Sequence, residues 1–143
     1  MRIKHAAKSA AVARTLLSAV LVAILLSSGG ASIAQTANFS VDFSWSGTAA
    51  CFDPQSPPFS LMGVPAGTKR LKFAMRDLDA PNFQHGGGTV PYQGQNQIAR
   101  GAFSYRGPCP PQGQHRYQWT VEAQDDAGGT LATATVTKEF PPR

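Results

Sequence analysis

The segment 107–117, which reads GPCPPQGQHRY, restricts the fold of this chain more than any other stretch. Its three prolines fix φ and remove backbone donors, so the segment forms neither a helix nor a central strand. We expect a stiff, extended loop. Residues 115–123 are rich in aromatic and β-branched side chains and predict a strand. His115 therefore begins a strand beside a rigid loop, which suits either an ordinary connection or the wall of a ligand pocket.

Residues 1–34 have the composition of a signal peptide. They carry four basic residues and no acid, followed by an apolar run at 16–26 and small residues at 32–34. The apolar run is short for a membrane span, although an uncleaved N-terminal anchor is the alternative. We therefore predict a signal helix over 1–34 and a mature domain over 35–143 that is not transmembrane. The expected location is the periplasm or the secreted fraction.

The positive charge of the chain lies largely in this leader. Four of the thirteen Lys and Arg residues fall within 1–34, which leaves nine against eight Asp and Glu residues. A net charge near +1 on the remainder gives no reason to propose binding to nucleic acid or to a membrane surface. The 109 residues of 35–143 suffice for one domain with a modest core.

The two cysteines, Cys51 and Cys109, are predicted to form a disulfide because export places them in an oxidising compartment. The bond would close a loop of 58 residues. In the chain-entropy model such a closure stabilises the fold by about 4 kcal/mol. A reactive thiol or a metal ligand is the alternative, but the chain has no C-x-x-C spacing.

The pattern of the mature region is mostly β. Alternating or short apolar runs predict strands at 38–45, 59–62, 70–77, 115–123 and 131–140, with a hairpin connection at 125–129. Residues 82–98 are rich in Gly, Gln and Asn and predict a long loop. No segment has the pattern of an amphipathic helix. The expected fold class is therefore mainly β, an antiparallel β-sandwich with few or no helices after the leader.

Titratable side chains gather near two of these strand ends. Asp77 and Asp79 follow the strand 70–77, and Pro81 holds the turn after them. At i and i+2 the two carboxylates share a face if the strand continues, although solvated caps at a strand end are the bland alternative. His85 precedes a run of three glycines, and it and His115 are the two histidines of the mature region.

In order along the chain, five blocks resemble the phosphatidylethanolamine-binding protein (PEBP) family, which includes the Raf kinase inhibitor protein. They are SPP at 56–58, GVPAGTK at 63–69, DLDAP at 77–81 with His85 after it, GPCPP at 107–111 and GQHRY at 113–117. Cysteines at the positions of Cys51 and Cys109 make the chain similar to the exported bacterial branch. Two departures stand out, Leu78 in place of a proline and Gly86 in place of a tryptophan, and the chain resembles a trimmed member.

The resemblance implies a PEBP-like β-sandwich with a small anion pocket at one end. Carried over by position, the residues expected to line that pocket are Asp77, Asp79, Pro81, His85, Pro108, Pro111 and His115. Tyr117, with Tyr105 as the alternative, is expected to add a hydroxyl. Arg116 should point away from the pocket and form an ion pair.

The predicted function is binding of a phosphate-containing or other anionic ligand, such as a phospholipid headgroup. Two imidazoles supply N–H donors to a phosphate, and a nearby carboxylate would accept from an ammonium group. The first alternative is a protein-interaction module of the kinase- or protease-inhibitor type with a vestigial pocket. A metal site or a hydrolase is the second, but the spacing fits no metal motif and no nucleophile–base pair stands out. We expect no cofactor, no metal and no enzymatic activity.

Overall fold

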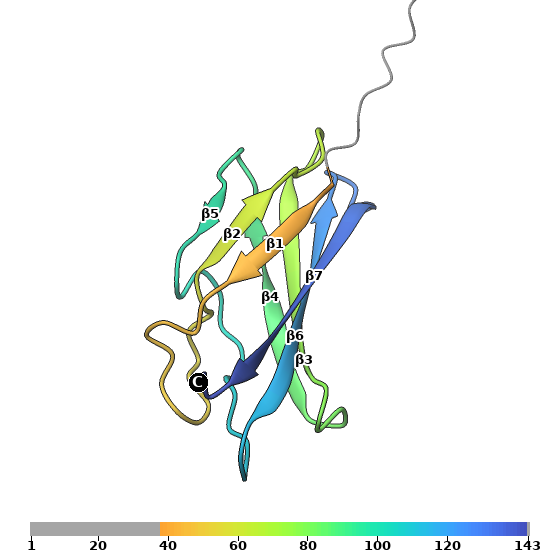
Figure 1. Ribbon diagram of the computed structural model, residues 1–143. Coiled ribbons are helices and arrows are strands. Elements are labelled where there is room, and N and C mark those ends of the chain that lie inside the picture. Colours follow the sequence, from red (N-terminus) through yellow and green to blue (C-terminus); the bar gives the residue numbers. More distant parts are fainter. Residues whose placement is uncertain (1–37, 143) are drawn as a thin grey trace, which may run out of the picture. The chain divides into compact units, whose positions relative to one another are not determined.

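The computed structural model describes residues 38–142, which form seven β-strands (Figure 1). The strands are β1 Ser40–Phe43, β2 Phe59–Met62, β3 Arg70–Asp77, β4 Gln84–Pro91, β5 Gln97–Ile98, β6 His115–Gln124 and β7 Thr130–Phe140. No helix that could cross a membrane occurs among these described residues. The predicted signal peptide, 1–34, lies outside them.

Side chains alternate between the interior and the surface along the two central strands. In β3, Leu71, Phe73 and Met75 are buried while the residues between them are exposed. In β6, Tyr117, Trp119 and Val121 are fully buried. Successive side chains of a strand point to opposite faces of its sheet, so this period of two turns one face of each strand toward the core.

The strands form two sheets that pack face to face. β1, β2 and β5 make the smaller sheet in the order β1-β2-β5, and the larger sheet has the order β4-β3-β6-β7. All the strand pairs are antiparallel. The ring of Phe59 in the smaller sheet lies 4.7 Å from the ring of Phe73 and 5.2 Å from that of Trp119 in the larger one. The predicted antiparallel β-sandwich is confirmed.

The prediction of a long loop at 82–98 is wrong, because this segment contains β4 and β5. The glycines that suggested a loop are required where neighbouring atoms approach the strand. A Cβ atom on Gly87 would lie 1.9 Å from the carbonyl oxygen of Phe73, and one on Gly88 would lie 2.4 Å from the Cβ of Phe103. Gly87 and Gly88 therefore mark close packing, whereas Gly86, with a φ of 75°, lies where the register between β3 and β4 shifts.

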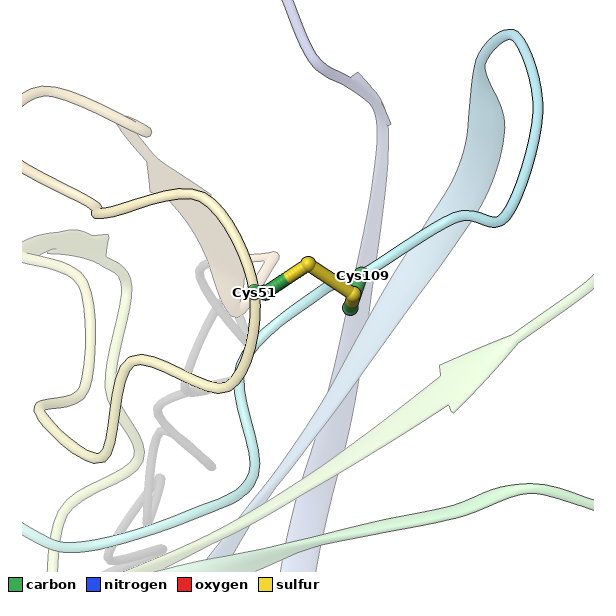
Figure 2. Close-up of a disulfide and its surroundings, with 2 residues drawn as sticks. All are labelled: Cys51 and Cys109. Atoms are coloured by element: carbon green, nitrogen blue, oxygen red, sulfur yellow. A yellow bond between two sulfur atoms is a disulfide. The ribbon is translucent and has the colours of Figure 1, made fainter.

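The predicted disulfide between Cys51 and Cys109 is confirmed (Figure 2). It joins the loop between β1 and β2 to the proline-rich loop before β6. Asp53 holds the first loop in place by accepting hydrogen bonds from the backbone of Ala49 and Gln55 and by pairing with Arg100 at 2.6 Å. Its own carbonyl accepts from the backbone N–H of Gly107 at 3.0 Å. The two loops are thus connected by a covalent bond and by hydrogen bonds.

Candidate functional site

A cavity of about 290 Å³ lies at one end of the larger sheet. It forms where β3 ends, where β4 and β6 begin, and where the two disulfide-linked loops meet. The residues that line it are Phe52, Asp77, Ala80, Phe83, His85, Cys109, Pro111, His115 and Tyr117. The two histidines in the described part of the chain, His85 and His115, therefore reach one cavity from different strands.

His115 is held by the carboxylate of Asp77. Its Nδ1 atom lies 2.7 Å from Oδ2 of Asp77, and because a carboxylate accepts, we assign the proton to Nδ1. Oδ1 of Asp77 accepts from the backbone N–H groups of Asp79 and Ala80. Burial acts to raise the pKa of Asp77, but the hydrogen bonds from His115 and the two N–H groups outweigh it, and the pKa lies below its ordinary value. With its proton on Nδ1, the neutral imidazole of His115 carries a lone pair at Nε2.

His85 is held in the same way by a backbone carbonyl. Its Nδ1 atom lies 2.6 Å from the carbonyl oxygen of Arg106, which accepts, so the proton is again assigned to Nδ1. The backbone N–H of Arg106 donates in return to the carbonyl of His85 at 2.8 Å. The side chain is 3% exposed, and its Nε2 atom has no hydrogen-bond partner among the described residues.

Tyr117 supplies the other unsatisfied polar group of the cavity wall. Its hydroxyl is buried and makes no hydrogen bond of ordinary geometry, although the Asp77 carboxylate and the backbone of Cys109 are close enough to affect its pKa, and its ring lies 5.4 Å from that of His85 in an edge-to-face arrangement. Burial and the charge of Asp77 raise the pKa of the phenol well above its ordinary value. The hydroxyl therefore remains protonated at neutral pH and can donate a hydrogen bond.

Two crystal structures resemble this fold. One is a phosphatidylethanolamine-binding protein homologue from Chlamydia trachomatis, with a TM-score of 0.56 and 20% identity, covering 73% of this chain and 98% of that one. The other is YbcL from Escherichia coli, described as a new member of the mammalian PEBP family. It has a TM-score of 0.55 and 20% identity, and the match covers 73% of this chain and 99% of that one. At this identity the likeness concerns the fold.

The sequence comparisons point to the same family. The family model described as phosphatidylethanolamine-binding protein matches residues 82–140, which include both histidines of the site. A UPF0098 protein of Methanothermobacter thermautotrophicus is 36% identical over 93 residues, 49% of this chain and 60% of that protein. Together these comparisons support membership of the phosphatidylethanolamine-binding protein family, the family that the sequence motifs resemble. The chain spans less than two thirds of the length of that curated relative.

Three of the residues expected at the pocket do not line the cavity. Asp79 pairs with Arg116 at 2.7 Å, which confirms the ion pair predicted for Arg116. Hydrogen bonds from the Arg116 side chain and backbone lower the pKa of Asp79 to about 2. Pro81 is exposed on the turn after β3, whereas Pro108 is fully buried.

The other expected residues lie together. The cavity wall includes five residues named from the sequence: Asp77, His85, Pro111, His115 and Tyr117. Tyr105, the alternative source of a hydroxyl, is buried with its ring 5.3 Å from that of Trp119 and does not line the cavity. Whether these residues bind a ligand stays a prediction.

Sequence reasoning missed Phe52 and Phe83 at this cavity. Both rings belong to irregular segments, one in the disulfide-linked loop and one in the turn between β3 and β4. A signal was present, because Phe52 is adjacent to Cys51 and Phe83 is two residues before His85.

Across residues 38–142, no group of three or more His, Cys, Asp or Glu side chains is arranged to hold a metal ion. The cavity is lined instead by two imidazoles, a phenol and two phenyl rings, and Nε2 of His85 and the hydroxyl of Tyr117 are buried atoms without a hydrogen-bond partner among the described residues.

Proposed function

We propose that this chain is an exported binding protein whose cavity takes the phosphate group, or a similar anionic group, of a small ligand. One observation carries the proposal. Imidazoles from β4 and β6 line one cavity, and each is oriented by a hydrogen bond from Nδ1. With Nδ1 committed, each Nε2 is the ring nitrogen that remains for a ligand. Such fixed polar groups in an otherwise apolar hollow are typical of small-molecule sites.

An anion accepts a hydrogen bond from either imidazole only when the Nε2 atom of that ring carries a proton. A neutral imidazole that carries its proton on Nδ1 presents a lone pair at Nε2, so it donates to a phosphate oxygen only after Nε2 is protonated. The hydroxyl of Tyr117 donates without such a change. We therefore expect a bound anion to take up protons from solution and its affinity to rise as the pH falls.

The arrangement favours the phosphate part of a headgroup over its ammonium part. Asp77 is the one carboxylate among the described residues that line the cavity, and it already accepts three hydrogen bonds. The proposed role is binding without chemical conversion. The one hydroxyl on the described wall belongs to Tyr117, whose raised pKa makes the phenol a poor nucleophile.

Isothermal titration calorimetry with inorganic phosphate and with phosphoethanolamine, at several values between about pH 5 and 8, tests the proposal. We expect both ligands to bind, with similar affinity at any one pH and with tighter binding at lower pH. His115→Ala removes one donor to the anion and should weaken binding by about tenfold or more, since a hydrogen bond to a charged group contributes about 1.5–3 kcal/mol.

Met62→Ala is the matched control, because Met62 is 72% exposed on β2 and does not line the cavity. It should leave the affinity unchanged. Absence of heat with both ligands at every pH, or full affinity in His115→Ala, would contradict the proposal.

Export is the second part of the proposal. Its support is the composition of residues 1–34, together with a disulfide in the described part of the chain, a bond typical of exported proteins. Cell fractionation with N-terminal sequencing of the exported protein tests it, and we expect a new N-terminus within a few residues of Gln35.

A further inference from the structure

Two aromatic rings at the cavity are partly exposed. Phe52 is 52% exposed and Phe83 is 37% exposed, and both line the cavity. Their ring centroids lie 6.1 Å apart at an interplanar angle of 18°, so the rings are stacked. Phe83 also lies 4.6 Å from the ring of His85. The two phenyl rings are therefore accessible to solvent, and one of them, Phe83, also contacts His85, an imidazole proposed to bind the anion.

The position of Phe52 requires an unfavourable backbone conformation. Cys51 and Phe52 have φ values of 60° and 57°, in the left-handed region that side chains other than glycine seldom adopt. Two consecutive residues of this kind persist where the surroundings impose them, and such strain is concentrated at functional sites. Here the disulfide fixes one residue, and the hydrogen bonds of Asp53 fix the position that follows Phe52.

The guanidinium group of Arg106 lies over the two phenyl rings. The guanidinium carbon of Arg106 lies 5.8 Å from the centroid of Phe52 and 5.4 Å from that of Phe83. Within residues 38–142 no carboxylate forms a salt bridge with Arg106. The backbone of the same residue orients His85. Arg106 thus places an uncompensated charge beside the rings.

We propose that the natural ligand carries its anionic group on an aromatic ring, as an aryl phosphate does. Its ring would lie against Phe52 and Phe83, and its anionic group would lie toward His85 and His115, with Arg106 adding a second attraction. The cavity volume of about 290 Å³ is near the ~300 Å³ at which pockets for small organic molecules begin, more than a lone phosphate needs. This inference rests on the proposed function and names its ligand class.

An aromatic ligand suits this wall better than an aliphatic one. Five of the lining side chains are aromatic rings: Phe52, Phe83, His85, His115 and Tyr117. Aromatic pairs in edge-to-face or offset geometry gain free energy beyond the area that they bury, and a guanidinium interacts favourably with ring faces. An alkyl group of equal size would gain the burial alone.

Calorimetry with three probes tests the inference: inorganic phosphate, phenyl phosphate and cyclohexyl phosphate. We expect phenyl phosphate to bind at least about tenfold more tightly than inorganic phosphate, and about three- to tenfold more tightly than cyclohexyl phosphate. Phe52→Leu and Phe83→Leu keep much of the apolar area and remove the ring. Each should reduce the preference for phenyl over cyclohexyl phosphate by about threefold, and the double variant should abolish it.

Met62→Ala, which lies outside the cavity, should bind inorganic phosphate within about twofold of the wild-type affinity and should retain the full preference for phenyl phosphate. Thermal unfolding checks that each variant is folded. If inorganic phosphate binds but phenyl phosphate binds no more tightly than cyclohexyl phosphate, the inference is overturned and the proposed function stands. The same holds if the double variant keeps the preference. If none of the three probes binds, both fail.

Discussion

At the scale of single residues, Asp77 connects the turn after β3 with the proposed ligand site. One carboxylate oxygen accepts from two backbone N–H groups of the turn, and the other accepts from Nδ1 of His115. Its side chain is 5% exposed, so an unsatisfied group created here would be costly. The same carboxylate therefore supports both local folding and the orientation of an imidazole.

Asp77→Asn should reduce the dependence of stability on acid pH. The folded-state pKa of Asp77 lies below its unfolded value of about 3.9, so its contribution is present above that value and is lost as the pH falls through the folded-state pKa. At pH 7 the variant should be less stable by about 1–3 kcal/mol. Between pH 4 and pH 2 it should lose less free energy of unfolding than the wild type, as measured by urea denaturation.

Asp126→Asn is the control for this series, because Asp126 is an exposed acid in the connection between β6 and β7. Its stability should follow that of the wild type at each pH. An acid-induced loss in Asp77→Asn equal to that of the wild type would contradict the role assigned to the carboxylate.

At the scale of elements, the sequence predicted those strands whose apolar residues alternate. The range 70–77 coincides with β3, and β6 and β7 each extend one residue beyond the range expected. Glycine composition misled the prediction for β4, because a sequence does not distinguish a flexible glycine from one demanded by a close neighbour. The same limit applies to Phe52, whose position depends on the disulfide and on its backbone conformation.

Gly87→Ala should disrupt the pairing of β4 with β3. The added Cβ would lie 1.9 Å from the carbonyl oxygen of Phe73, an atom of the neighbouring backbone that cannot move independently of its strand. Overpacking of this kind typically costs about 3 kcal/mol or more when backbone must shift. Urea denaturation measures the loss, and failure to fold is the extreme form of the same result.

Thr89→Ala provides the comparison on the same strand. Thr89 is exposed and lies opposite Lys72, so the change removes side-chain atoms without inserting any. It should cost less than about 1 kcal/mol. A loss in Gly87→Ala no larger than the loss in Thr89→Ala would show that β4 accommodates a side chain at that point.

At the scale of the whole molecule, the site depends on segments far apart in the sequence. Cys51 and Cys109 are 58 residues apart, and their bond joins the loop that carries Phe52 to the loop that carries Pro111. The family motifs predicted that Asp77, His85 and His115 would meet. They could not predict which rings would complete the wall, because that depends on the path of a loop anchored at one cysteine.

The proposed export and the disulfide lead to one joint prediction. The full chain should be exported and recovered with its two cysteines oxidised, whereas a chain that lacks residues 1–34 should remain in the reducing cytoplasm with two free thiols, as counted by thiol titration. The reduced protein should be less stable to urea by about 4 kcal/mol, because the 58-residue closure is lost from the unfolded state. It should also lose its preference for phenyl phosphate, since the position of Phe52 is no longer fixed.

Oxidation of the purified leaderless protein should restore both properties, and Cys51→Ser combined with Cys109→Ser should reproduce the reduced state in the exported protein. The variant separates the effect of the bond from the effect of the compartment. Equal stability of the oxidised and reduced forms would show that Asp53, through Arg100 and the backbone of Gly107, suffices to hold the loop. Retention of the full-length chain in the cytoplasm would refute export while leaving the binding proposal to be judged on calorimetry alone.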